Sequence, residues 1–274
     1  MATVEDVKRF WEENPLWTGE SRFEPGSIEF FEEHRQVYLN DCFAGEWDDR
    51  FDPPLENRDK VLDLGCGPGF WTIELSERGC KQLVAADLTC NALELTSKRC
   101  ELYKVEADYS EQNAESLSFA DASFSHVNCQ GVIHHTPSTE KSIAEIARVI
   151  KPGGTACISV YHKNIFLKLW PVFKPFAKIL YKFGAGLKGR GREGIFAEKD
   201  AQEIVRLYDG IDNPIGKAYS KKEFSKMLQP HFEIEQMYLH FFPARSMPFL
   251  VPKKLHKFLD AKLGFMIYAN LRKI

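Results

Sequence analysis

Hydrophobic and polar positions first alternate at helical spacing, near the start of the chain. In 3–13, the apolar positions that share one helix face are Val4, Val7, Phe10 and Trp11. Thr3 and Asp6 stand where a capping box is expected, and Pro15 ends the pattern. A second helix is expected to begin at Ser27, with inner side chains at Ile28, Phe31, Tyr38 and Leu39. The sequence therefore predicts a helical cap over 1–59.

From position 60 the pattern changes to short apolar runs that alternate with helical stretches. The runs predict strands at 60–64, 82–86, 102–106, 124–129 and 156–161. The stretches between them predict helices at about 70–78, 90–100 and 138–150. Because such alternation builds right-handed βαβ units, 60–161 is expected to form an α/β core, doubly wound and mainly parallel. Ligands bind beyond the carboxyl ends of the strands of such a sheet.

After 161 the chain becomes basic and aromatic. A helix with one apolar face is expected in 165–183, broken by Pro171 and Pro175, and its apolar face comprises Phe166, Leu169, Trp170, Phe173, Phe176, Leu180 and Phe183. A loop is expected at 184–194, a helix at 220–229, a strand at 232–242 and a helical tail over 252–274. These elements divide the remainder into a lid or insertion at 162–219 and a completing segment at 220–274.

Charge is distributed unevenly along the 274 residues. Residues 1–60 carry 7 Lys/Arg against 16 Asp/Glu, whereas 161–274 carry 21 against 10. We expect the two ends to approach each other in the fold; the alternative is a basic surface for anionic substrates or membranes. The segment 163–192 has eight Lys/Arg and no acid. It fits a lid over an apolar acceptor, a helix at a membrane surface, a nucleic-acid patch or a solvated helix that covers the core.

Cysteine usage and hydropathy bear on the compartment. The seven cysteines are scattered without a C-x-x-C pair, which favours a reducing compartment and argues against disulfides or a zinc site. No apolar leader and no run long enough to span a membrane is visible. We therefore expect a cytoplasmic protein without a metal site.

A glycine-rich turn carries the clearest chemical signal. An apolar strand ends at Asp63 and leads into Gly65, Gly67 and Gly69, after which a helix begins. Glycines let the backbone approach a bulky ligand, and N–H groups at a helix start can hold a carboxylate. Asp63 can meet an ammonium group, directly or through water. A dinucleotide fingerprint needs a small residue where Phe70 stands, which argues against NAD.

A second carboxylate strengthens this interpretation. The strand at 82–86 leads into Asp87, where hydrogen bonds to the two hydroxyls of a ribose are expected. The alternative interpretation is that Asp87 caps the following helix.

With these motifs in order, residues 60–160 resemble the class I (Rossmann-like) S-adenosylmethionine-dependent methyltransferases, particularly those that act on small molecules. The segments 113–119, 130–137 and 149–154 resemble, in turn, the family's adenine-contacting segment, its loop after the fourth strand and the turn before the fifth. Asn113 replaces the family's Asp and removes the charge from that contact. The resemblance implies a seven-stranded sheet and S-adenosylmethionine as cofactor. The expected cofactor-binding residues are Asp63, Gly65, Cys66, Gly67, Gly69, Asp87, Leu88, Asn113, Ala114 and Gln130.

On the acceptor side, methyl transfer to a hydroxyl requires removal of a proton. His134 and His135 are the candidate bases, Tyr161 and His162 are further candidates, and the N-terminal cap is a candidate cover. The expected acceptor is a small molecule, apolar or anionic in character. A sequence pI of about 6.3 argues against nucleic acid as a partner. Two rival hypotheses remain: an inactive methyltransferase-like scaffold, and an NAD-type oxidoreductase.

Overall fold

The computed structural model describes residues 2–182, 200–244 and 247–274. The helices are α1 (Val4–Glu13), α2 (Ile28–Phe43), α3 (Phe70–Glu77), α4 (Cys90–Tyr103), α5 (Thr139–Val149), α6 (Ile165–Lys168), α7 (Trp170–Lys182), α8 (Ala201–Tyr208), α9 (Lys221–Leu228) and α10 (Lys253–Leu263). The strands are β1 (Lys60–Leu64), β2 (Gln82–Asp87), β3 (Asp108–Glu111), β4 (Phe124–Gln130), β5 (Ile150–His162), β6 (Ala218–Tyr219), β7 (Phe232–His240) and β8 (Met266–Lys273). The expected loop at 184–194 lies outside the described residues.

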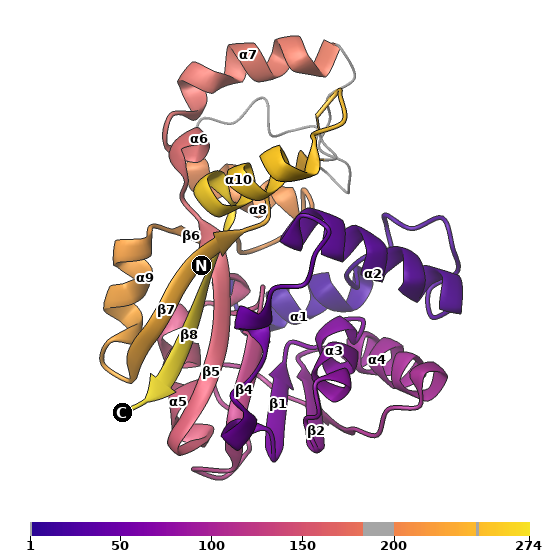
Figure 1. Cartoon of the computed structure of the whole chain (residues 1–274), viewed down its shortest axis with the longest axis vertical. Coiled ribbons are helices and arrows are strands. Elements are labelled where there is room, and N and C mark those ends of the chain that lie inside the picture. The colour runs from indigo at the N-terminus through magenta and orange to yellow at the C-terminus, as the bar shows by residue number, and fades with distance from the viewer. Residues whose placement is uncertain (1, 183–199, 245–246) are drawn as a thin grey trace.

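The strands form one mixed sheet in the order β3-β2-β1-β4-β5-β8-β7, and the two-residue β6 also pairs with β5 (Figure 1). Pairing is parallel from β3 to β5, and β8 runs antiparallel to both β5 and β7. The order reverses between β1 and β4, which is where α/β sheets open a ligand crevice. This architecture confirms the expected α/β class and sheet size.

Both faces of the sheet are buried, because neighbouring residues of one strand join different clusters. Ile158 of β5 belongs to an apolar cluster with α5 and α9 side chains, whereas Cys157 belongs to a cluster with α2 and α3. The second cluster is aromatic and joins the N-terminal cap to the last strands through Phe43, Phe51, Phe70, Trp71, Tyr238 and Tyr268. The cap thus shares a buried cluster with the sheet.

Two predicted elements are wrong. The strand expected at 102–106 is instead the end of α4, where Lys104 takes a left-handed conformation, and the edge strand follows at β3. Its sequence Asp-Tyr-Ser-Glu is polar because an edge strand is half exposed, so hydropathy does not reveal it. The tail expected as helix divides at Gly264 into α10 and the buried strand β8.

Other local expectations have mixed outcomes. The Thr3–Asp6 capping box of α1 is present, and Ser27 caps α2. Ile28, expected on the inner side of α2, is half exposed. Pro175 lies inside α7 without ending it, and the interruption falls earlier, between α6 and α7.

The two oppositely charged ends of the chain do meet. Glu46 of the cap forms ion pairs with Lys253 and Lys257 of α10. Asp48 also reaches His240 at the end of β7, with 2.8 Å between Oδ2 and Nε2. The expected approach of the acidic and basic ends is therefore confirmed at this junction.

Candidate active site

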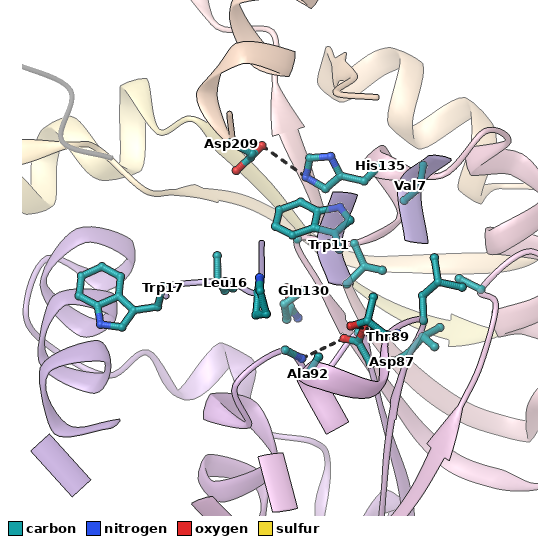
Figure 2. A pocket seen from close by; sticks show the side chains of 18 of the residues that line it. Val7, Trp11, Leu16, Trp17, Asp87, Thr89, Ala92, Gln130, His135 and Asp209 are labelled. Atoms are coloured by element: carbon teal, nitrogen blue, oxygen red, sulfur yellow. Dashed lines mark hydrogen bonds and ion pairs between the residues drawn. The ribbon is translucent and has the colours of Figure 1, made fainter. Parts of the chain in front are cut away.

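A cavity of about 290 Å³ lies where β1, β2, β4 and β5 end. Segments distant in sequence enclose it: α1 and the loop after it, the glycine turn, the loop after β4, and residues just after α8 and β7. Figure 2 shows Asp87 and Thr89 at one end of the cavity and His135 with Asp209 at the other, and Trp11 beside His135. The cavity therefore has two chemically different ends.

The glycine turn forms the wall of the first end. Gly65 has φ +76°, and a Cβ there would lie 2.1 Å from Cγ2 of Val132, so only glycine fits. Gly67 has φ +52° and borders the cavity, where a Cβ would meet only Leu16 Cδ2 at 3.9 Å. Gly69 packs instead against Thr96 of α4. The turn is a cradle whose open space a larger residue would fill.

Asp87 lies at the floor of the same end. Its Oδ2 accepts a hydrogen bond from the Gly67 N–H (3.1 Å), and its Oδ1 accepts from the N–H and hydroxyl of Thr89. Burial raises the pKa of Asp87, although these hydrogen bonds act in the opposite direction. Each carboxylate oxygen has two lone pairs and Oδ1 already accepts twice, so Oδ2 is the oxygen that can accept a further hydrogen bond from a ligand. Asp87 thus borders the cavity and fixes the turn before α4, whose N-cap residue is Thr89 rather than Asp87 itself.

Asp63 does not line the cavity. It is fully buried and accepts from the Thr72 hydroxyl (2.6 Å) and the Asn128 amide (2.9 Å). Burial raises its pKa to about 6. Gln130 does line the cavity, and its amide donates to the Asn128 side chain and to the Cys157 carbonyl. Asp63 therefore supports the cavity floor from behind, through Asn128 and Gln130.

The other residues expected to bind the cofactor also divide into those that line the cavity and those that do not. Leu88, Asn113 and Ala114 line the cavity, whereas Cys66 and Gly69 do not. The Asn113 side-chain oxygen accepts from the Glu115 N–H (2.9 Å), so Asn113 shapes its own turn. Gln112 also borders the cavity and was not expected.

Helix α1 covers the cavity from the Asp87 end to His135. Val4, Val7 and Trp11 line the cavity, and Glu12 accepts from the Cys90 and Asn91 N–H groups at the start of α4. A carboxylate at a helix N-terminus is favourable because it pairs with unsatisfied N–H groups. Lys8 forms an ion pair with Glu111 at the end of β3. The first residues of the cap are thus fixed to the loops around Asp87.

The three candidate catalytic residues lie close together, but only two of them border the cavity. His135 and Tyr161 line it, whereas His134 is fully buried behind them, 4.2 Å from the Tyr161 ring between centroids. Burial lowers the pKa of His134 well below its usual value, and the neighbouring His135 adds to this. His162 is directed away and contacts the Gly264 carbonyl at 2.9 Å. Among the candidates, His135 and Tyr161 can meet a ligand.

Asp209, just after α8, joins these two residues and was not expected. Its carboxylate accepts from the Tyr161 hydroxyl at 3.0 Å and lies 3.5 Å from His135 Nε2. His135 Nδ1 lies 2.7 Å from the Ile215 carbonyl, which can only accept, so Nδ1 carries the proton. Nε2 is then the nitrogen available to take a proton, beside a carboxylate.

A largely aromatic wall completes the cavity, which Glu20 and Asp41 also border. It is built by side chains from the cap, from α8 and from the last strands, namely Trp17, His34, Tyr38, Tyr208, Phe241, Met266 and Tyr268. Buried Arg99 supports this wall from α4: its guanidinium contacts His34 Nδ1 at 3.2 Å and donates to the Pro68 carbonyl of the glycine turn. Burial lowers the pKa of Arg99 to about 10.

Comparison in sequence identifies related methyltransferases. A methyltransferase-domain family model matches residues 62–158. A ubiquinone biosynthesis O-methyltransferase of Azoarcus sp. (strain BH72) is 32% identical over 175 residues, which cover 59% of this chain and 71% of the relative. A demethylmenaquinone methyltransferase of Lactococcus lactis is 32% identical over 126 residues, which cover 44% and 48%. The chain spans only 22% of a bifunctional biotin biosynthesis protein from Cellvibrio japonicus.

Solved structures share the fold. An S-adenosylmethionine-dependent methyltransferase from Methanosarcina mazei has a TM-score of 0.55 and 22% identity, and the match covers 80% of this chain and 94% of that one. One from Aquifex aeolicus has a TM-score of 0.54 and 13% identity, with 92% and 100% covered. Together with the matches in sequence, these findings place the chain in the family of class I S-adenosylmethionine-dependent methyltransferases.

Proposed function

We propose that this protein transfers a methyl group from S-adenosylmethionine to a hydroxyl group of a small, largely apolar molecule. The observation that carries the proposal is the two-ended cavity, with the Gly67–Asp87 cradle at one end and the His135–Asp209 pair at the other. Two of the relatives are named as a ubiquinone biosynthesis O-methyltransferase and a demethylmenaquinone methyltransferase, and these names support a small-molecule acceptor. The seven free cysteines support a reducing compartment such as the cytoplasm.

The first end would hold the adenosyl part of the cofactor. Asp87 would accept from a ribose hydroxyl at Oδ2, and the Gly65–Gly67 backbone leaves room for the ligand to lie against the turn. Leu88, Asn113 and Ala114 would surround the base, and Gln130 would border the methionine part. When bound, the cofactor supplies a methyl group already activated by the positive charge on its sulfur.

The second end would prepare the acceptor. His135 would take the hydroxyl proton at Nε2, and the Asp209 carboxylate would stabilise the imidazolium that forms. Tyr161, as a donor to Asp209, would fix the direction of that carboxylate rather than act as the base. The aromatic wall would exclude water and position the acceptor near attack distance.

The cofactor assignment is tested by calorimetry with adenosylhomocysteine. Asp87→Ala removes a charged hydrogen-bond acceptor and also the group that holds the Gly67 and Thr89 backbone in place, so the affinity should fall about 100-fold. Asp108→Ala is the matched control, because Asp108 is an exposed carboxylate on the adjacent strand β3. Equal affinities of the two variants, with both folded by circular dichroism, would refute the proposed cradle.

A further inference from the structure

One end of the molecule bears large apolar side chains in contact with solvent. Helices α7 and α10 lie at this end, at the top of Figure 1. Eight large apolar side chains in these helices or in the few residues before them have exposed fractions between 43% and 97%. They are Leu169, Val172, Phe176, Ile179, Phe249, Leu250, Leu255 and Phe258. We call these eight the apical apolar surface. Single exposed apolar residues are ordinary, but a group of this kind marks an interaction site.

The spacing of these residues makes them faces rather than scattered positions. Val172, Phe176 and Ile179 recur at intervals of four and three, so they lie on one side of α7. Leu255 and Phe258 recur in the same way on α10. Phe166 and Phe265 stack at 6.4 Å, and the Asn164 amide donates to the Leu263 carbonyl; these contacts join the start of α6 to the end of α10.

Positive charge predominates on the two segments that carry this surface. Residues 163–182 contain five lysines and no acid, and 247–263 contain four lysines with Asp260 as the one acid. Asp260 is buried against His240, and Lys253 and Lys257 pair with Glu46. Lys254 and Lys262 are exposed and stand four residues before and after Phe258, on the same side of α10. Positive and apolar groups are thus presented together, although the whole chain has a net charge of −3.

We propose that the apical apolar surface docks on an anionic lipid bilayer. Apolar side chains would enter the boundary between headgroups and acyl chains, and the lysines would contact lipid phosphates. A second copy of the chain would bring lysines against lysines, and a nucleic acid would leave the apolar side chains uncovered. In the described parts of the chain, no helix is long and apolar enough to cross a membrane.

Vesicle sedimentation with the full chain tests this proposal. We expect binding to vesicles that contain phosphatidylglycerol, little binding to phosphatidylcholine alone, and release by high salt. Lys254→Glu with Lys262→Glu should lower the partition coefficient about tenfold or more, since each lysine near an anionic surface contributes a several-fold factor. Phe176→Ser with Phe258→Ser should lower it to a similar extent because buried aromatic surface is lost.

Matched controls separate this surface from general effects. Leu55→Ser with Ile211→Ser removes two exposed apolar side chains elsewhere, and Lys81→Glu with Lys151→Glu reverses two exposed charges elsewhere. Both control variants should bind vesicles as the wild type does, and all variants should keep their affinity for adenosylhomocysteine. The proposal is overturned by equal binding of apical and control variants, by equal binding to both lipids, or by self-association that Phe176→Ser with Phe258→Ser abolishes.

Discussion

The two ends of the cavity are built in different ways. The proposed adenosyl end comes from short, continuous motifs, because the glycine turn follows directly from β1 and Asp87 is the last residue of β2. The proposed acceptor end is assembled from His135, Tyr161 and Asp209, which are separated by long stretches of chain. A common cofactor can be held by a fixed local geometry, whereas an acceptor site must be shaped by whatever segments the fold brings together.

The largest effect is expected from a substitution that disrupts only the first end of the cavity. Gly65→Ala places a methyl group 2.1 Å from Val132 and forces alanine into φ +76°. Adenosylhomocysteine affinity should fall by more than about 100-fold, since the turn must shift away from its ligand. Calorimetry gives the affinity, and thermal unfolding gives the stability.

Gly153→Ala is the control for that substitution. Gly153 has φ +72°, and no atom lies within 4 Å of the point that a Cβ would occupy, so alanine there meets the same backbone strain without the crowding. It should cost about 1 kcal/mol of stability and leave ligand affinity intact. Similar losses of affinity in the two variants would mean that strain, not the shape of the cradle, governs binding.

A smaller effect should separate the second end from the first. Asp209→Asn removes the charge beside His135 Nε2, so kcat with a phenolic acceptor such as catechol should fall about tenfold to 100-fold. Affinity for adenosylhomocysteine should not change, because Asp87 and the glycine turn are untouched. Asp212→Asn, at an exposed position nearby, serves as the control. A loss of cofactor affinity with unchanged kcat would contradict the division into two ends.

The smallest effect on the cavity is expected at His240, outside it. Burial alone lowers the pKa of His240, but its hydrogen bonds with Asp260 and Asp48 outweigh this and raise the pKa. The stabilisation is therefore complete below the unfolded-state pKa of about 6.5 and is lost as pH rises through the higher folded-state pKa. His240→Gln should cost about 3 kcal/mol at pH 6, with less difference at pH 9. Urea unfolding at both pH values measures the free energy of unfolding of each variant. An equal loss of stability at pH 6 and pH 9 would exclude a contribution from the charged His240.

The same contrast explains what could be predicted from the sequence. The strands β1, β2 and β4, the glycine turn and Asp87 follow from local patterns, and so does the capping box of α1. Asp209 could not be found, because nothing in the local sequence shows that it meets Tyr161, 48 positions earlier. The sequence also could not decide between His134 and His135, since a single turn after β4 directs one to the cavity and the other into the core.

The anchoring of α1 has a consequence for ligand exchange. Glu12 and Lys8 hold the helix on the loops around Asp87, while Val7 and Trp11 face the interior of the cavity. A ligand that contacts Val7 and Trp11 would therefore link its own binding to docking of the helix, and each would favour the other by the same factor. Strengthening those anchors would lengthen the residence time of the spent product as well as that of the reactant, so turnover sets an upper limit on how firmly the first helix can close.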